Sequence, residues 1–373
     1  MKKIFILLTI VCLLISCSKT KTFQISGKLT DFLEKEPTML FLKIRNADNE
    51  LINIDSTYLD NDGAFVLKGK SSETDLYYLA DSDNAFVIGI FVDPGDKITV
   101  NGSVFDFDNI KIQGSKTQTN YEEFLSLVIP KQNEQENIRQ KYGYITNDLS
   151  ISEEDRQSII DELVFAFDEL NNEIDSITID YIGKNSSTII AAYLVYRYVN
   201  MLDSSVEIEE QLQLLDPAMN HKFITLSKAI LEKVKQTEVG SVLPNIELPD
   251  ENGKLVSLES LRGKYVLVDF WATWCSSCMS EILHLKKIYH EYHTKGFEIY
   301  SISLDYSNEE WLAGIERYDL NWITVTELPG SPTAKQMAIK YIPTSFLLDP
   351  NGVIVAVNAS NESLMQILEE VIH

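Results

Sequence analysis

The chain has few cysteines and few positive charges, and both shortages restrict its function. Only 4 of its 373 residues are cysteine, and its 32 lysines and arginines are outnumbered by 56 aspartates and glutamates, giving a formal net charge of −24. Nucleic-acid binding requires clustered basic side chains that neutralise phosphates, so neither DNA nor RNA is expected as a partner. We interpret the negative charge as a solvated surface with no specific role.

A hydrophobic run near the N-terminus is too short to span a membrane. It extends from Ile4 to Ile15, whereas a transmembrane helix needs roughly 20 apolar residues. Lys2 and Lys3 precede the run and Ser16 follows it, which is the pattern of a secretory signal peptide. We therefore expect residues 1–16 to be a signal peptide.

The end of this leader contains a cysteine. The segment Leu14-Ile15-Ser16-Cys17 resembles the lipobox of bacterial lipoproteins, in which the cysteine becomes the first residue and carries lipid. This resemblance implies lipidation of Cys17, a lipidated tether over residues 17–22, and a lipoprotein that is anchored in a membrane of the cell envelope and faces the periplasm. The alternative is an ordinary cleaved signal with an incidental cysteine.

Two of the four cysteines remain for the folded part. Cys12 and Cys17 belong to the leader, which leaves Cys275 and Cys278. With two residues between them, the second thiol, one turn into a helix, can reach the first thiol at the helix N-terminus and close a reversible disulfide. Unpaired N–H groups and the positive end of the helix dipole stabilise a thiolate there. We predict Cys275 as the nucleophile and Cys278 as the resolving thiol.

Other uses of this cysteine spacing lack their usual companions. A structural zinc site normally has a second Cys-x-x-Cys or a paired histidine motif, and His284, His290 and His293 lie too far along the same predicted helix to complete a tetrahedron. A structural disulfide usually joins distant segments. A peroxiredoxin has the order Pro-x-x-x-Thr-x-x-Cys, which the residues before Cys275 do not supply. We expect a redox dithiol with no metal and no cofactor.

Hydrophobic periodicity divides the chain into three parts. Residues 23–114 read as short strands separated by turn sequences, which predicts an antiparallel β-sandwich. Residues 115–237 have a helical period and predict an α-helical region. Residues 238–373 alternate strands and helices and predict a small mixed α/β sheet with helices on both faces. The chain is therefore predicted to be a multi-domain protein.

The third part contains the dithiol. Its first long strand is predicted at residues 265–271, directly before the two cysteines, and is followed by a helix at 276–293. Further helices are predicted at 308–318 and 333–341, and a strand at 344–348. The dithiol therefore lies where a buried strand turns into a helix.

Two motifs in this part are similar to a known family. They are GKYVLVDFWATWCSSC at residues 263–278 and YIPT at residues 341–344. Both resemble the TlpA/ResA-type thioredoxin family, which implies a thioredoxin fold over residues 238–373 and thiol-disulfide oxidoreductase activity. The β-rich part resembles the uncharacterised domain that often precedes such modules in bacterial lipoproteins, and this resemblance implies no settled function.

Two acidic residues are predicted near the dithiol. Asp269 interrupts an apolar strand six residues before Cys275, where burial is expected to raise the pKa of a carboxyl group. The resemblance implies that Asp269 relays a proton to or from Cys278. Glu281 falls on the same helical stripe as Cys278, and the resemblance implies proton transfer or substrate selection. The alternatives are a salt-bridged Asp269 and a Glu281 that pairs with Lys286 or with the helix dipole.

The substrate side of the site also follows from the resemblance. The thioredoxin fold sets a cis proline opposite the dithiol, and Pro343 with the preceding Ile342 matches that position, where substrate chain binds as an added strand. Trp274, Met279 and Leu283 form a predicted apolar rim that suits an extended or unfolded polypeptide.

The sequence departs from the family pattern at two positions. Ser277 replaces the proline that commonly precedes the second cysteine, and Leu283 stands where a kinking proline is frequent. Because the loop has no histidine or lysine to stabilise a thiolate, we expect a pKa for Cys275 near the thioredoxin value of about 7. This favours a reductant or isomerase over an oxidant.

The predicted function combines these features. Export would place the dithiol in an oxidising compartment, and the chain has no second dithiol relay, so an external electron donor in the membrane is expected. We predict a membrane-anchored thiol-disulfide oxidoreductase of the cell envelope that reduces or isomerises protein disulfides, with cytochrome c maturation as one setting. The alternative is a redox-switched binding lipoprotein whose N-terminal parts capture a partner.

Overall fold

The computed structural model describes residues 20–31, 38–46, 50–106, 109–148, 150–327 and 332–372. The chain forms two compact units, one ending at Ile190 and the other beginning at Ala191. The predicted signal peptide and Cys17 lie outside the described residues. Within those residues, no helix has both the length and the hydrophobicity needed to cross a membrane.

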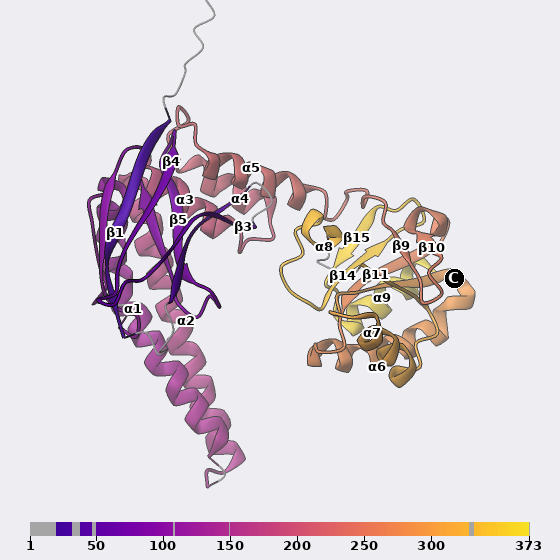
Figure 1. Cartoon of the computed structure of the whole chain (residues 1–373). Coiled ribbons are helices and arrows are strands. Elements are labelled where there is room, and N and C mark those ends of the chain that lie inside the picture. The colour runs from indigo at the N-terminus through magenta and orange to yellow at the C-terminus, as the bar shows by residue number, and fades with distance from the viewer. Residues whose placement is uncertain are drawn as a thin grey trace, which may run out of the picture. The chain divides into compact units, whose positions relative to one another are not determined.

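The first unit begins with eight strands in two sheets (Figure 1). The sheet orders are β4-β1-β7-β8 and β3-β2-β5-β6, and the inner faces of both sheets contribute to one hydrophobic core. Side chains alternate as a half-buried strand requires: Phe65 and Leu67 are buried and Val66 between them is exposed. The strands are β1 Lys21–Thr30, β2 Met39–Arg45, β3 Leu51–Tyr58, β4 Ala64–Ser71, β5 Asp75–Asp81, β6 Val87–Val92, β7 Lys97–Ser103 and β8 Lys111–Gln113.

The predicted sandwich is confirmed except for the direction of one strand pair. β1 pairs antiparallel with β4 but parallel with β7, so this sheet is mixed and not purely antiparallel. Periodicity in the sequence identifies each strand but says nothing of which strands become neighbours. After β4 the chain crosses to the other sheet, where it forms β5 and β6. It then returns as β7, which enters the first sheet beside β1 and runs in the same direction.

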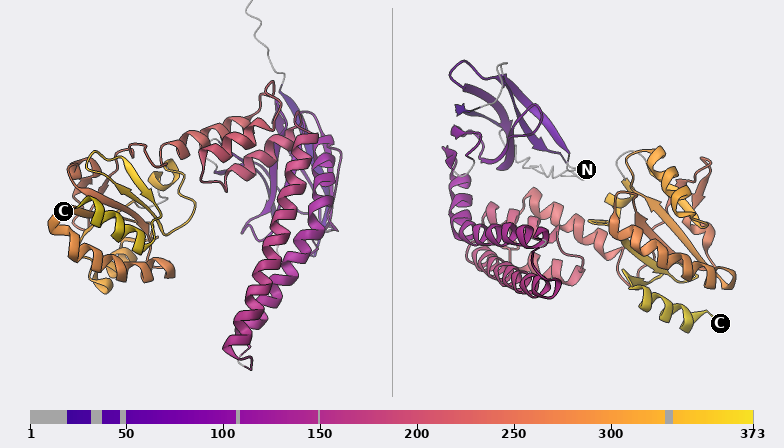
Figure 2. Two further views of the ribbon diagram at one scale, coloured as in Figure 1. Left: turned by 180° about the vertical axis from the view of Figure 1, so that it is seen from behind. Right: turned by 90° about the horizontal axis from the view of Figure 1, so that it is seen from below.

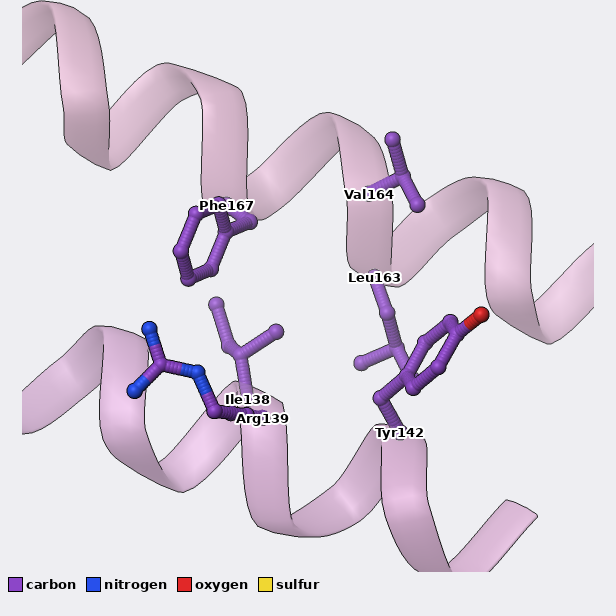
Figure 3. Close-up of a pocket in the computed structure, with 6 residues that line it drawn as sticks. All are labelled: Ile138, Arg139, Tyr142, Leu163, Val164 and Phe167. Atoms are coloured by element: carbon purple, nitrogen blue, oxygen red, sulfur yellow. The ribbon is translucent and has the colours of Figure 1, made fainter. Parts of the chain in front are cut away.

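Two long helices, α1 (Lys116–Asn147) and α2 (Glu153–Lys184), lie side by side in the first unit (Figures 1 and 2). The Ser152 hydroxyl caps α2 by accepting a hydrogen bond from Asp155 N at 3.2 Å. Between the helices is a cavity of about 170 Å³. Figure 3 shows the residues that line it: Ile138, Arg139, Tyr142, Leu163, Val164 and Phe167.

The second unit contains a five-stranded sheet of order β13-β12-β11-β14-β15. β12 and β13 run parallel to the central strand β11, and β14 and β15 form a hairpin beside it with β14 antiparallel to β11. The main elements are α3 Ile189–Val199, which crosses the unit boundary, α4 Ser205–Gln213, α5 Lys222–Lys235, β9 Glu247–Pro249, β10 Leu255–Ser257, β11 Tyr265–Trp271, α6 Ser276–Tyr292, β12 Phe297–Ser303, α7 Asn308–Tyr318, β13 Ile323–Thr326, α8 Pro332–Gln336, β14 Thr344–Leu348, β15 Ile354–Val357 and α9 Asn361–Val371. Short 3-10 turns occupy Leu258–Leu261 and His293–Lys295.

Both faces of this sheet are covered, as predicted (Figure 1). Leu267 and Trp271 of β11 belong to a cluster with residues of α6 and α9, and this cluster includes both cysteines. Val268 and Phe270 point to the opposite face and join a second cluster. Because side chains alternate along a strand, Asp269 lies on the α6 face together with the dithiol.

The helix predicted at residues 333–341 is wrong at its C-terminal end. α8 ends at Gln336, and Ala338 adopts a left-handed conformation with φ 54°. After this turn Ile339 packs against the core cluster on that face of the sheet. Tertiary packing therefore overrides the local helical pattern here.

Gly314 permits a close contact between α7 and the segment before the dithiol. A Cβ atom at Gly314 would lie 2.5 Å from Thr273 Cγ2 and 3.2 Å from the Trp271 ring. Alanine normally stabilises a helix interior by about 1 kcal/mol relative to glycine. Overpacking costs about 1–3 kcal/mol. We therefore expect Gly314→Ala to lower the melting temperature of the C-terminal unit in calorimetry.

A matched control is available in α1. A Cβ at Gly143 meets nothing within 4 Å, so Gly143→Ala should stabilise its own unit by about 0.5–1 kcal/mol. A Gly314→Ala protein that is stabilised as much as Gly143→Ala would contradict the close contact.

Candidate active site

Cys275 occupies the N-cap of α6. β11 ends at Trp271, and the loop that follows turns sharply, with Cys275 N donating to Ala272 O at 3.1 Å. Cys275 Sγ then accepts a hydrogen bond from Cys278 N at 3.2 Å. A side chain at this position usually supplies an oxygen to the free N–H groups of the first turn. Here a sulfur does so at the positive end of the helix, where negative charge is stabilised.

The two cysteines form a disulfide, with their Cα atoms 5.3 Å apart. Cys275 is 6% exposed and Cys278 is 2% exposed, so an incoming sulfur reaches Cys275 more readily. The Ser277 hydroxyl lies 3.4 Å from Cys275 Sγ. The serine that replaces the family's proline therefore places a hydrogen-bonding group beside the predicted nucleophile.

Asp269 is buried beneath the dithiol helix. It lies opposite Ser301 in the β11–β12 register, and Ser301 Oγ donates to Asp269 Oδ2 at 3.3 Å. The pKa of Asp269 is raised to about 7, mainly by burial and then by the negative charge of Glu281, while the hydrogen bond from Ser301 acts in the opposite direction. A salt-bridged Asp269, the alternative from the sequence, would need a cationic side chain in contact with it. The hydrogen-bond donor to Asp269 is instead the hydroxyl of Ser301.

Glu281 is half-buried on α6. The predicted stripe on this helix is buried, at Cys278, Ile282, Leu285, Ile288 and Tyr292. Burial raises the pKa of Glu281, and the positive charge of His284 lowers it. Lys286, its predicted alternative partner, instead contacts Asp319 at 3.2 Å and Tyr318 O at 2.8 Å. Asp269 and Glu281 are thus two interacting acids on the dithiol side of the sheet.

The segment predicted to bind substrate contains the cis peptide. The Ile342–Pro343 bond is cis, as expected. Ile342 packs against the hydrophobic cluster that contains Cys275 and Cys278. The fold therefore brings this segment, 64 residues or more from the cysteines in sequence, to the same cluster as the dithiol.

The members of the predicted apolar rim differ in exposure. Trp274 is 52% exposed and Leu283 is also exposed, whereas Met279 is only partly exposed and also packs against the core cluster. The Trp274 ring stacks on Tyr306, with ring centres 5.9 Å apart and planes at 20°. Tyr306 is 79% exposed, and no pattern in the sequence identified it, because it follows β12 and meets Trp274 only through the fold.

Comparison with known proteins agrees with this geometry. Residues 239–357 match the AhpC/TSA family, and residues 23–121 match a domain of unknown function, DUF4369. The thiol-disulfide oxidoreductase ResA of Bacillus cereus is 30% identical over 146 residues, which cover 39% of this chain and 83% of that protein. ResA of Bacillus subtilis is 31% identical over 137 residues, covering 36% and 74%. The chain belongs to the ResA-type thiol-disulfide oxidoreductases.

Solved structures are similar over the same part of the chain. A thioredoxin domain of a Bacteroides vulgatus thiol-disulfide oxidoreductase is 37% identical and covers 36% of this chain and 99% of that one, with a TM-score of 0.35. A thiol-disulfide oxidoreductase from Bacteroides fragilis is 36% identical, covers 36% and 100%, and has a TM-score of 0.34.

ResA-type membership confirms the predicted family and the predicted thioredoxin-like enzyme class. The β-rich part, predicted to be an uncharacterised domain, matches one. The individual roles predicted for the site residues stay predictions; these residues are Cys17, Asp269, Trp274, Cys275, Cys278, Glu281, Ile342 and Pro343.

The raised pKa of Asp269 predicts a pH dependence of stability. Its folded-state pKa of about 7 lies above the ordinary value of 3.8, so the folded protein binds this proton more tightly than the unfolded chain does. The resulting stabilisation is complete below about pH 4 and is lost as the pH rises to about 7. We expect the free energy of unfolding of the wild type to fall relative to that of Asp269→Asn across this window.

Denaturant unfolding of the oxidised protein between pH 4 and 8 measures this difference. Glu281→Gln removes the nearby negative charge and should move the window to lower pH. A wild-type minus Asp269→Asn difference that does not change with pH would show that Asp269 keeps an ordinary pKa.

Proposed function

We propose that this chain is a lipid-anchored thiol-disulfide oxidoreductase of the cell envelope that reduces or isomerises disulfides in other proteins. The main support is the Cys275–Cys278 pair, in which the more exposed sulfur caps a helix and the less exposed one lies a single turn inside it. The exposed rings of Trp274 and Tyr306 beside the pair suit a polypeptide substrate.

The chemistry proceeds by two exchanges. The Cys275 thiolate attacks one sulfur of the substrate disulfide, forms a mixed disulfide and releases the other substrate sulfur as a thiolate. The Cys278 thiolate then attacks Cys275 Sγ, closes the intramolecular disulfide and releases the second substrate thiolate. Two electrons pass from the dithiol to the substrate. An external dithiol donor must return them, and we propose a membrane protein for that role.

The two carboxyl groups handle the proton of Cys278. A thiol must lose its proton before it can attack, and its ordinary pKa is about 8.5. Asp269 lies on the same face of the sheet as Cys278, and its pKa of about 7 lets it accept a proton at neutral pH. Glu281 is half-buried and its charge acts on Asp269, so we assign it the proton exchange with solvent.

The surroundings of Cys275 favour a reductant. The sulfur accepts one backbone N–H and lies near a neutral hydroxyl, and neither Cys275 hydrogen bond involves a cation. Such a site is more similar to that of thioredoxin, a reductant with a potential of about −270 mV, than to that of DsbA, an oxidant with a potential of about −120 mV. Proteins with surplus disulfides are the proposed substrates, and apocytochrome c, which needs reduced cysteines, is one candidate.

Replacing each cysteine separately tests the two roles. With insulin as substrate and dithiothreitol as electron source, Cys275→Ser should reduce turnover to the background rate. Cys278→Ser should instead accumulate a mixed disulfide with the substrate, visible by non-reducing electrophoresis. Ser276→Ala, at an exposed neighbour, is the matched control and should keep wild-type turnover.

The same assay separates this proposal from redox-switched binding. A wild-type protein that binds a partner in only one redox state, but never reduces a disulfide faster than dithiothreitol alone, would favour the binding function. Equal turnover by wild type and Cys275→Ser would exclude the proposed nucleophile.

The lipid anchor rests on the Leu14–Cys17 motif. We expect Cys17→Ser, expressed in a bacterium that processes lipoproteins, to lose fatty-acid labelling and to move from the membrane pellet to the soluble envelope fraction. Cys12→Ser removes a cysteine within the leader and should leave labelling unchanged. Labelling that persists in Cys17→Ser would place the anchor elsewhere.

A further inference from the structure

Asp305 is a buried aspartate beside the site, and it is not among the site residues predicted from the sequence. Asp305 follows β12 and is only 3% exposed. Its Oδ1 accepts hydrogen bonds from Thr273 N at 2.9 Å and from Thr273 Oγ1 at 2.6 Å. Its Oδ2 accepts from Ser303 Oγ at 2.8 Å, and Ser303 Oγ accepts from Asp305 N at 3.1 Å. A buried carboxylate is costly unless such donors surround it, so this arrangement fixes its position.

The partner of Asp305 lies in the loop that carries the nucleophile. Thr273 is two residues before Cys275, and both its backbone N–H and its hydroxyl are bound to the one carboxylate. On its other side, the Thr273 methyl group lies close to Gly314 of α7. Thr273 is therefore held by hydrogen bonds and by packing at once.

The neighbouring residues make contacts in the same order. Leu304 N donates to Trp271 O at 2.8 Å, one residue before Asp305. Trp274 stacks on Tyr306, one residue after it. Three residues before the dithiol, Trp271, Thr273 and Trp274, therefore contact three consecutive residues after β12. Asp305 makes the central one of these contacts and is buried.

We propose that Asp305 is a positioning residue of the dithiol, acting through Thr273. This proposal deepens the proposed function and rests on it. Cys275 can cap α6 only in an extended conformation, which it has at φ −88° and ψ 101°. Asp305 fixes the backbone at Thr273, two residues before Cys275. Cys275 Sγ is thereby kept where it can accept the hydrogen bond from Cys278 N. The hydrogen bond from that N–H stabilises the thiolate more than the thiol, and this preference depends on the anchor.

The acidity of Cys275 is the decisive readout. We would measure the pH dependence of Cys275 alkylation by iodoacetamide in the reduced full chain, with peptide mass spectrometry to separate it from the other cysteines. Asp305→Ala should raise the pKa of Cys275 by about one unit, a tenfold weaker acid. Asp305→Asn, which retains one acceptor oxygen, should have a smaller effect. Thr273→Ser should leave the pKa of Cys275 near the wild-type value, because serine keeps both the backbone N–H and the hydroxyl that donate to Asp305.

Two further variants separate positioning from stability. Thr273→Val keeps the shape of threonine but loses the hydroxyl donor, and should raise the pKa of Cys275 by an intermediate amount. Tyr300→Phe is the matched control: it removes a partly buried hydrogen bond from β12, the strand that precedes Asp305, in which Tyr300 OH donates to Val256 O at 2.8 Å on the opposite face of the sheet. It should lower stability and leave the acidity of Cys275 unchanged.

The proposal is overturned if Asp305→Ala destabilises the protein as Tyr300→Phe does but leaves the alkylation pKa at the wild-type value. If Asp305→Ala fails to fold, Thr273→Val decides: an unchanged pKa overturns the proposal and a raised pKa supports it. Alkylation needs no protein substrate, so absence of insulin reduction by the wild type would reject the proposed function while leaving this test intact.

Discussion

The hydrogen bond from Cys278 N to Cys275 Sγ is the interaction on which the active site depends. It makes the reactive sulfur part of the structure that begins α6, because a helix N-terminus must satisfy its free N–H groups with some acceptor. The buried stripe of α6 keeps the helix against the sheet, and the central strand β11 sets where the helix can start. Packing far from the sulfur therefore determines its electrostatic environment.

Two buried aspartates in this unit illustrate how hydrogen-bond donors decide what a carboxyl group can do. Asp269 receives one hydroxyl contact at 3.3 Å, which does not offset the cost of burial, so its pKa rises to about 7 and it can exchange a proton. Asp305 receives three shorter hydrogen bonds from two residues, and serves as an anchor. Similar burial is thus compatible with the proton transfer that we propose for Asp269 and with the positioning that we propose for Asp305.

The parts of the site that could be predicted are those encoded by local patterns. β11 and β14 have their predicted bounds, because an apolar run between turn residues identifies a buried strand, and α7 begins and ends as its periodicity indicates. Asp305 and Tyr306 could not be assigned, since they meet Thr273 and Trp274 only because β11 and β12 pair in a particular register. The same limit applies to Met279, whose place on the helix indicated the rim but not that the side chain would also pack against the core cluster. Strand direction between β1 and β7 was likewise a question of topology, which periodicity does not address.

The aromatic pair beside the dithiol bears on how the proposed activity would select its substrates. The net charge of −24 repels acidic polypeptides, and salt screens this repulsion beyond about 10 Å. Trp274 and Tyr306 expose large aromatic rings beside Cys275, the proposed nucleophile, and such rings suit contact with a polypeptide. The rings already stack on one another, so little side-chain freedom remains to be lost when a substrate binds. Short-range contact with exposed apolar segments, such as those of incompletely folded proteins, therefore fits this surface better than recognition of a charged folded partner.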